Sequence, residues 1–402
     1  MIILQINTVI NIGSTGRIAE QIGETIKKNG EDSYIAFSRP GLPSSSLPVQ
    51  IGNQQDIYKH VLISRLFDQH GFGSKTATNR FIEEIEILDP DIIHLHNIHG
   101  YYLHIGILFN FLKVINKPVV WTFHDSWPYT GHCAYYESVN CEKWKIECHH
   151  CPKTKMYPQS WFFDNSQKNF KKKKVLFTGI NNMHIITPSK WLKDQIKESF
   201  LKNYPIGVIH NGVDLKIFKP SNSVNFLSSQ GIKKKLTVLG VASIWDKRKG
   251  LQDFIDLAKL LNNSFQIVLI GLSKSQIKSL PKNMKGILRT ENVQELARWY
   301  SSAAVFINPT SQDNFPTTNI EALACGTPVI TYDTGGSPEA IDENTGLVVD
   351  KGDINGLKNA IDTIITEKKK FSVVLCNERA KKYFNKDDRF MDYYNLYKEL
   401  VR

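Results

Sequence analysis

The chain has 402 residues, of which 41% are hydrophobic and 22% are charged, a balance typical of a folded, water-soluble protein. Its length exceeds one ordinary hydrophobic core and predicts two domains of about 200 residues each. No apolar run reaches the roughly 18 residues that a membrane-spanning helix needs, and no signal peptide is recognisable, so we expect a cytoplasmic protein.

The net charge is +11, and much of it comes from clustered lysines. Such clusters attract phosphates on nucleotides, lipid head groups or nucleic acids, although they also fit ordinary solvated faces. The chain lacks the motifs of the common RNA-binding modules and any zinc-finger helix, so we expect no nucleic-acid partner. The clusters fall at 168–174, 233–235, 247–249 and 368–370.

Strand and helix patterns alternate through the first half. Ile2–Ile6 is predicted to be a buried strand, followed by a Gly-Ser-Thr-Gly turn at 13–16 and a helix over about 17–28, which Gly30 ends. An irregular insert at about 126–174 carries four cysteines. Further short buried strands are predicted at Ile92–Leu95, Val119–Phe123 and Ile185–Thr187.

The alternation resumes near residue 207, which predicts a second α/β domain. The serine-rich stretch 220–230 is expected to be a loop inside it. We predict two Rossmann-like, doubly wound parallel sheets, in an N-terminal domain 1–205 and a C-terminal domain 206–385, with an amphipathic helix at 386–402 packing back onto the first. The strands expected in the second domain are Gly207–His210, Leu236–Ala242, Gln266–Ile270, Val305–Asn308 and Pro328–Tyr332.

The most specific signal in the chain runs from Asp313 to Glu321. Two carboxylates lie eight positions apart around an Asn-Phe-Pro turn, between a predicted strand and a helix-like run. Such a loop presents an acid and several backbone amides at a strand end, where open α/β sheets bind their ligands. The candidate ligand-binding residues are Asp313, Asn314, Phe315, Pro316, Thr317, Thr318 and Glu321.

A cationic turn precedes that loop along the chain. Lys247, Arg248 and Lys249 follow the predicted strand 236–242 and open a helix. Cations beside a helix N-terminus form a natural site for a diphosphate. Alone, the same residues fit an exposed basic turn, but their place before the acidic loop favours the phosphate site.

The acid-x7-acid spacing with these flanks resembles the signature of retaining nucleotide-sugar glycosyltransferases of the GT-B fold, family 4. The His-Asp-Ser-Trp stretch at 124–127 and the four-cysteine insert resemble the family members that build colanic acid and capsule polysaccharides. The resemblance implies two domains facing a cleft, a UDP- or GDP-linked sugar donor, and a glycan or lipid-linked acceptor at the inner face of the plasma membrane. Basic patches that contact an anionic membrane would suit such an acceptor.

The resemblance also implies roles for individual residues. Lys249 and Arg248 would contact the diphosphate, and Asp313 would bind hydroxyls of the donor sugar. Glu321 would accept both ribose hydroxyls, since one carboxylate can accept two hydrogen bonds. Backbone groups of 314–318 would line the sugar and the α-phosphate, except at the proline, which has no N–H.

Two positions depart from the family pattern, and one loop is only weakly marked. Ser243 or its neighbour stands where related enzymes usually carry an arginine, and Asp313 replaces the usual glutamate. The first departure leaves the phosphate geometry open, with Arg248 as the residue that can compensate, and the second can shift the sugar preference. Arg289 and Thr290 fall in the loop that reads the base in such enzymes, although a plain loop fits them equally well.

In the N-terminal domain, Gly13 and Gly16 would let the backbone approach a phosphate and the acceptor, but they also fit a turn without a ligand. The resemblance makes His124 the histidine that reaches the donor sugar. An isolated histidine at a strand end is also commonly structural. Nearby alternatives, at least one of them expected to be a core residue, are His94, His96 and His99.

The implied reaction is metal-independent transfer with retention, by same-face attack through an oxocarbenium-like ion pair. A GT-B nucleotide-sugar epimerase and a non-catalytic sugar-nucleotide-binding module remain as alternatives. An NAD-dependent oxidoreductase does not fit, because the turn at 13–16 departs from Gly-x-Gly-x-x-Gly.

The four cysteines of the insert include a pair, Cys148 and Cys151, with the spacing of a zinc knuckle. In a reducing cytosol, clustered thiols favour a metal over disulfides, so we predict a structural zinc, with free thiols or redox pairs as alternatives. The insert's aromatic residues fit either an acceptor-stacking surface or a small core of their own. The predicted zinc ligands are Cys133, Cys141, Cys148 and Cys151.

Overall fold

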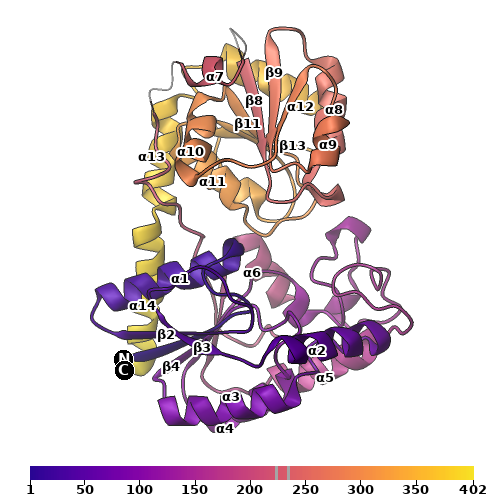
Figure 1. Cartoon of the computed structure of the whole chain (residues 1–402), viewed down its shortest axis with the longest axis vertical. Coiled ribbons are helices and arrows are strands. Elements are labelled where there is room, and N and C mark those ends of the chain that lie inside the picture. The colour runs from indigo at the N-terminus through magenta and orange to yellow at the C-terminus, as the bar shows by residue number, and fades with distance from the viewer. Residues whose placement is uncertain (222–224, 233–235) are drawn as a thin grey trace. The chain divides into compact units, whose positions relative to one another are not determined.

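The computed structural model divides the chain into two compact units (Figure 1). Unit 1 comprises Met1–Ile209 together with Phe390–Arg402, and unit 2 comprises His210–Arg389. The predicted domain limits, after 205 and after 385, fall just before these boundaries.

The structure describes residues 1–221, 225–232 and 236–402. The predicted lysine cluster 233–235 lies outside the described residues, as does part of the serine-rich stretch. The described part of that stretch contains a helical turn, α7 (Phe226–Ser229), where a loop was expected. None of the helices formed by the described residues is long and apolar enough to cross a membrane.

Unit 1 is built on a seven-stranded sheet in which every pair of neighbouring strands is parallel. Its strands are β1 (Ile2–Ile6), β2 (Asp32–Phe37), β3 (Leu47–Gln50), β4 (Ile92–Leu95), β5 (Val119–Thr122), β6 (Met183–Thr187) and β7 (Ile206–Val208). The order β3-β2-β1-β4-β5-β6-β7 is doubly wound, as predicted. The winding reverses between β1 and β4, which is where such sheets bind ligands.

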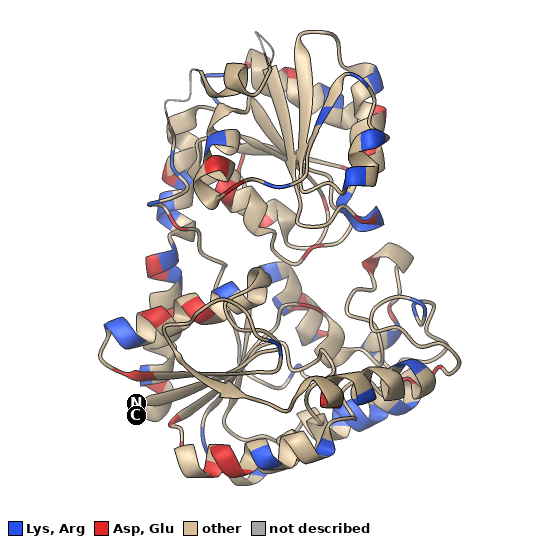
Figure 2. Ribbon diagram, viewed as in Figure 1, with Lys and Arg blue, Asp and Glu red and all other residues tan. Residues whose placement is uncertain are grey.

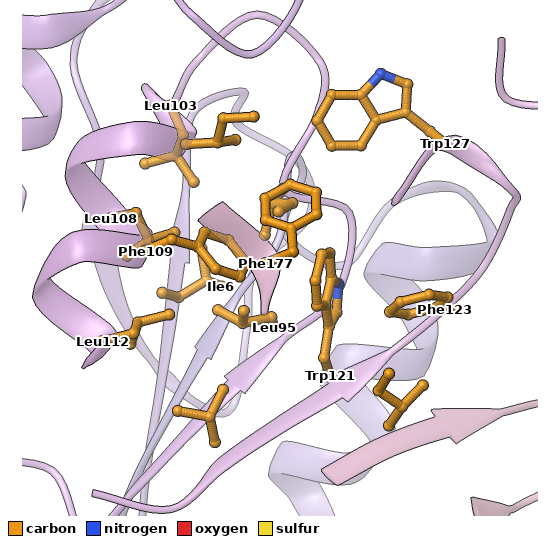
Figure 3. Close-up of a cluster of buried hydrophobic side chains, with 14 of the residues drawn as sticks. Ile6, Leu95, Leu103, Leu108, Phe109, Leu112, Trp121, Phe123, Trp127 and Phe177 are labelled. Atoms are coloured by element: carbon orange, nitrogen blue, oxygen red, sulfur yellow. The ribbon is translucent and has the colours of Figure 1, made fainter. Parts of the chain in front are cut away.

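Helices cover both faces of this sheet (Figure 1). Their bounds are α1 (Gly13–Lys28), α2 (Gln54–Phe67), α3 (Lys75–Leu88), α4 (Ile105–Val114), α5 (Ser166–Phe177), α6 (Lys190–Lys197) and α14 (Lys386–Val401), with 3-10 turns η1 (Trp127–Tyr129), η2 (Glu137–Val139) and η3 (Lys143–Lys145). The core under α3 to α6 centres on the rings of Phe109, Trp121 and Phe177 (Figure 3). Each is fully buried, which for a side chain of this size contributes about 2–3 kcal/mol.

The other face of the sheet is covered by α1 and α14. Phe390, Tyr393 and Tyr397 of α14 are buried in this second core. The Tyr397 hydroxyl bonds to His94 Nδ1 at 2.7 Å, and the Thr122 hydroxyl donates to that of Tyr393 at 3.2 Å. The predicted return of the C-terminal helix to the first sheet is therefore confirmed.

Unit 2 holds a second parallel sheet, of six strands. These are β8 (Leu236–Val241), β9 (Phe265–Ile270), β10 (Met284–Ile287), β11 (Val305–Asn308), β12 (Val329–Tyr332) and β13 (Gly346–Val349). The order β10-β9-β8-β11-β12-β13 repeats the doubly wound plan, and the winding reverses between β8 and β11. The predicted fold class is thus confirmed for both sheets.

Two separate cores lie on the two faces of the second sheet. Helices α10, α11 and α13 cover one face, while α8 and α12 pack together on the other (Figure 1). The bounds of the remaining elements are α8 (Leu251–Leu260), α9 (Lys274–Lys278), α10 (Val293–Ser302), α11 (Thr317–Ala324), α12 (Ile354–Thr366) and α13 (Val373–Phe384), with η4 (Lys247–Lys249) and η5 (Ser337–Ala340).

Candidate active site

Two loops of unit 2 are joined at the point where its sheet reverses direction. One follows β8 and contains η4, and the other follows β11. The carbonyl oxygen of Arg248 accepts hydrogen bonds from the Ser311 N–H at 2.8 Å and from the Thr310 hydroxyl at 3.3 Å. The Arg248 guanidinium donates to the Gln312 carbonyl at 3.0 Å. These bonds fix the cationic turn against the acidic loop, although the two are far apart in sequence.

The centre of this arrangement is an ion pair. Lys249 Nζ lies 2.7 Å from Asp313 Oδ2, and each side chain is 19% exposed. The close packing requires the next residue to be glycine, because Gly250 has φ +74° and a Cβ there would lie 2.5 Å from the Pro309 oxygen. The sequence thus brings together a cation and an acid that remain accessible to a ligand.

The loop after β12 supports Asp313 from behind. Gly335 has φ +56°, and a Cβ at this position would meet the Asp313 carbonyl oxygen at 1.9 Å. The Gly336 N–H also donates to that oxygen, at 3.3 Å. The turn formed by Gly335 and Gly336 therefore holds the backbone of the first acid.

The start of α11 is anchored on both sides. Asn308, the last residue of β11, donates to Asn319 Oδ1 at 2.8 Å. Phe315 is buried and stacks on the His210 ring, with centroids 4.8 Å apart. Pro316 precedes the helix, whose first two residues, Thr317 and Thr318, are half-buried. A helix N-terminus is thus presented beside the Lys249–Asp313 pair.

The second acid, Glu321, is one turn into α11 and half-buried. Its Oε2 accepts a hydrogen bond of 3.0 Å from the hydroxyl of Tyr300, which is fully buried at the end of α10. Burial, reinforced by Glu321, raises the pKa of Tyr300 well above its usual value, so the phenol stays a donor to the carboxylate. The orientation of Glu321 is therefore set by a residue that the sequence analysis did not select.

The remaining predicted donor residues lie along the same edge of the sheet. Ser243 follows β8 and is exposed. Arg289 and Thr290 follow β10; the arginine is exposed and the threonine is half-buried. Among the described residues, the hydrogen bonds and ion pairs that the structure shows do not join these three to the Lys249–Asp313 pair.

In unit 1, the predicted glycine turn is part of a helix. Helix α1 begins at Gly13 and not near Arg17, so both Gly13 and Gly16 lie in its first turn. Gly13 adopts φ +66°, which favours glycine, and Ile12 caps the helix with extended backbone. Gly16 packs closely, because a Cβ there would lie 3.1 Å from the Val9 side chain, a tight contact.

His124 follows β5 and ends a chain of side-chain hydrogen bonds. Gln5 Nε2 donates to the Ala19 carbonyl at 2.9 Å, which turns Gln5 Oε1 toward His96 Nε2 at 3.0 Å. His96 Nε2 must therefore carry the proton, and its Nδ1 accepts from His124 Nε2 at 3.1 Å. These contacts assign the Nε2–H tautomer to His124 and leave its Nδ1 as the hydrogen-bond acceptor.

Both of these histidines are neutral at physiological pH. Burial lowers the pKa of His124 to about 4, against a smaller opposite effect of Asp125, and burial holds the pKa of His96 well below its usual range. Asp125 itself is paired with His99 Nε2 at 2.8 Å. His94 is a core histidine, fully buried between Thr122 and Tyr397.

The four cysteines of the insert converge in space. Together they line one small pocket, and none is in a disulfide. The Gly131 N–H donates to Cys148 Sγ at 3.2 Å. Within the described part of the chain, however, no three His, Cys, Asp or Glu side chains are already arranged to hold a metal ion.

The aromatic residues of the insert divide into two groups. Trp127, Tyr129, Tyr136 and Trp144 are buried in the main core of unit 1, which favours the structural alternative for them. Trp161, by contrast, is 40% exposed.

Comparison with known families agrees with this arrangement. A family model described as Glycosyltransferase Family 4 matches residues 16–217, about half of the chain. A second, described as Glycosyl transferases group 1, matches residues 235–367. The chain belongs to glycosyltransferase family 4.

One curated relative matches this glycosyltransferase from end to end. It is the putative colanic acid biosynthesis glycosyl transferase WcaC of Escherichia coli K12, 23% identical over 424 residues and covering 100% of both chains. Two solved structures share its fold. Sucrose-phosphate synthase of Thermosynechococcus elongatus gives a TM-score of 0.70 at 18% identity, covering 99% of this chain and 98% of the other. Anabaena HepE in complex with UDP-glucose gives a TM-score of 0.69 at 15% identity, and the match covers 99% of each chain. The fold is therefore GT-B.

Proposed function

We propose that this glycosyltransferase transfers a sugar from a UDP- or GDP-linked donor to a glycan or lipid-linked oligosaccharide in surface polysaccharide synthesis. The observation that carries the proposal is the Lys249–Asp313 pair, held at 2.7 Å where the second sheet reverses. A diphosphate needs a cation and a sugar needs hydroxyl acceptors, and the pair supplies both. HepE, solved with UDP-glucose, and WcaC, named for colanic acid synthesis, support the donor and the pathway class.

Each side chain of the site has a binding role in this proposal. Lys249 and Arg248 bind the donor's phosphates, while Asp313 accepts from hydroxyls of the sugar. Glu321 accepts from the ribose hydroxyls, with its carboxylate oriented by Tyr300. A pre-oriented carboxylate loses little conformational entropy when the ligand binds.

The chemistry follows from what these groups stabilise. The bond between the sugar's C1 and the β-phosphate oxygen breaks as the acceptor oxygen bonds to C1 from the same face, and the leaving phosphate takes the acceptor's proton. Lys249 and Arg248 stabilise the charge that grows on the diphosphate, which is where electrostatic catalysis is most effective. His124, neutral and with Nδ1 as acceptor, binds a hydroxyl of the donor sugar. The reaction as proposed needs no metal ion.

A donor screen tests the proposal directly. Thermal unfolding is followed with a panel of UDP- and GDP-sugars, with and without EDTA, for the intact chain and for Lys249→Ala. We expect one donor class to raise the melting temperature of the intact chain, EDTA to leave the shift unchanged, and the variant to lose it. A shift of equal size in Lys249→Ala would refute the site.

Product analysis separates transfer from its nearest rival. An epimerase converts a sugar nucleotide when no acceptor is present, whereas the proposed transferase releases free nucleoside diphosphate and needs an acceptor to make glycoside. NMR of the anomeric proton in the product then shows whether configuration is retained.

We also propose that Cys133, Cys141, Cys148 and Cys151 hold a structural zinc ion. All four line one pocket, and the N–H to sulfur bond at Cys148 is of the kind that stabilises a thiolate ligand. The segment around them forms only short 3-10 turns, η1 to η3, between β5 and α5, so it has little regular backbone bonding to fix it. The ion would draw the thiols together by side-chain rotation.

Metal analysis tests this assignment. Protein purified without chelators should contain about one zinc per chain, and Cys148→Ala should lose it together with insert order measured by hydrogen exchange. Cys376→Ala, which removes a buried thiol of unit 2, is the matched control and should keep the metal. If wild-type protein purified in this way contains no zinc and its four insert thiols react freely with a thiol reagent, the proposal is overturned.

A further inference from the structure

One face of unit 1 exposes an unusual concentration of large apolar side chains. Three consecutive aromatic residues, Trp161, Phe162 and Phe163, are 40%, 73% and 54% exposed. Helix α2 contacts this segment, and its Phe67 and Leu62 are also exposed. Exposed apolar residues scattered singly are ordinary, but a contiguous group marks an interaction surface. We call these five residues the aromatic patch.

The patch has a defined structure, because several contacts hold its two segments together. The Trp161 N–H donates to the Arg65 carbonyl at 2.7 Å, and Asn165 Nδ2 donates to the Phe67 carbonyl at 2.7 Å. The rings of Phe67 and Phe163 stack with centroids 6.1 Å apart. The loop after the cysteines is thereby fixed onto the end of α2 with its aromatic side chains exposed.

Cations lie on α5, which follows the aromatic segment directly in the chain. Lys168 and Lys171 are exposed on α5, and Lys172 lies over the Phe72 ring, 4.8 Å from its centre. Figure 2 shows Lys and Arg gathered along α5, whose start is joined to the end of α2. Glu147 pairs with Lys171 at 3.1 Å and offsets part of this charge.

One lysine of the predicted cluster does not belong to these surface cations. Lys173 is buried, and its Nζ donates to the carbonyls of Trp127 and Thr130. The accessible charge of α5 therefore lies on the side chains that flank it in sequence, and the surface contribution of 168–174 is smaller than its composition indicates.

The pairing of exposed aromatic rings with lysines fits one kind of partner. Tryptophan and phenylalanine are favoured at the boundary between lipid head groups and acyl chains, and lysines are drawn to anionic head groups. We propose that the aromatic patch and Lys168, Lys171 and Lys172 dock unit 1 on an anionic lipid bilayer. This inference rests on the proposed function for its purpose, which is access to a lipid-linked acceptor, but the docking itself needs no donor and no turnover.

Vesicle sedimentation tests the docking at low salt and without substrates. The intact chain should bind vesicles containing phosphatidylglycerol and not those of phosphatidylcholine alone. Replacing Trp161, Phe162 and Phe163 together by serine should abolish binding. Changing the three lysines to glutamine should weaken vesicle binding by about 100-fold, since each surface cation contributes roughly a factor of five.

Matched controls keep composition constant. Lys368, Lys369 and Lys370, exposed in unit 2, are changed to glutamine as the charge control, and Ile87 and Val114, 86% and 77% exposed on unit 1, to serine as the apolar control. Both should bind like wild type. Equal binding by the patch variants, or none by the intact chain, overturns the proposal. If the serine variant instead turns a dimer into a monomer while vesicles bind neither form, the patch pairs two copies and the proposal fails.

Tryptophan fluorescence provides an independent readout. Trp161 should shift to shorter wavelength and be quenched by brominated lipid when anionic vesicles are added, and Trp161→Phe should remove the response while binding persists. Donor-induced thermal shifts should remain normal in every patch variant. A patch variant that loses both donor binding and vesicle binding is misfolded, and the lysine variants then decide the question. If the wild-type chain binds vesicles but no donor, the result counts against the proposed function only.

Discussion

The two units share one doubly wound plan but hold their polar side chains in different ways. Every histidine of the chain except His210 lies in unit 1, and several are almost completely buried, including His60, His94 and His96. Unit 2 instead keeps its candidate binding charges in partly exposed loops, as in the Lys249–Asp313 pair. Unit 1 thus relies on neutral, buried hydrogen-bond chains, whereas unit 2 relies on charged groups at a ligand-accessible edge.

This difference shows that one fold can prepare a site in two ways. In unit 2, local sequence does most of the positioning, through tight glycine turns and a short helix. In unit 1, residues from separate strands must meet before His124 acquires a defined tautomer. We therefore expect unit 2 to be most sensitive to the removal of a single charge, and unit 1 to be most sensitive to disruption of its buried hydrogen-bond network.

The largest expected effect is the loss of Lys249. Lys249→Ala should lower kcat by about 10²–10³-fold, because the charge of the leaving diphosphate loses its nearest cation. Steady-state kinetics with the donor found in the screen measures it. Lys247→Ala, two residues away in the same turn, is the control and should lose less than threefold. Similar losses in both variants would mean that only the net charge of η4 matters.

Mild acid should weaken unit 1 before unit 2. Burial lowers the pKa of His60 to about 3 and holds that of His94 and His96 well below the usual 6.5. The unfolded chain therefore binds protons first, so stability is complete above pH 6.5 and falls as the pH drops. Each such histidine costs about 2 kcal/mol between pH 6.5 and 5. Hydrogen exchange, corrected for its intrinsic pH dependence, should show unit 1 losing protection while unit 2 keeps it; parallel loss would contradict the contrast.

The buried network can be tested at its far end. Gln5→Leu removes the acceptor of His96 Nε2–H, so the tautomer of His124 is no longer fixed, and we expect a roughly tenfold lower kcat. Nitrogen-15 NMR of the histidine side chains should show His124 changing from one tautomer to a mixture. Gln5→Glu, protonated at this buried position, can donate to the Ala19 carbonyl and still accept from His96, so it should restore the Nε2–H form. An unchanged tautomer in Gln5→Leu would show that His96 does not position His124.

The smallest expected effect concerns Glu321. Tyr300→Phe removes the hydroxyl that donates to its carboxylate, and we expect the donor KM to rise roughly threefold with kcat nearly constant. Phe218→Leu changes an aromatic neighbour of Tyr300 without touching this bond and serves as the control. A fall in kcat without a change in KM would place Tyr300 in the chemical step.

Sequence reasoning identified the parts of the fold and site that depend on residues close together in the chain. Short apolar runs predicted most of the central strands but not β2, and the order of motifs predicted both parallel sheets. The contiguous stretch from Asp313 to Glu321 could be read directly, because one loop and one helix carry it. Edge strands such as β3 and β10 were not predicted, since they are short and only partly buried.

What escaped sequence reasoning depends on contacts between distant segments. Gln5 looks like one polar residue in an apolar strand, and only the pairing of β1 with β4 brings it to His96. Tyr300 looks like an ordinary core aromatic until α10 packs beside α11. An isolated polar residue inside an otherwise apolar strand was the available signal for Gln5, and a hydroxyl-bearing aromatic at a helix end was the signal for Tyr300.

The discontinuity of unit 1 has a consequence for biosynthesis. Its segment 390–402 leaves the ribosome only after all of unit 2 has been made, yet it supplies Phe390, Tyr393 and Tyr397 to the core under α1. Unit 2 is contiguous and can fold as soon as it emerges. A nascent chain therefore carries a sheet face covered by α1 alone throughout the synthesis of unit 2, and the apolar side chains that await α14 are open to chaperones during that time.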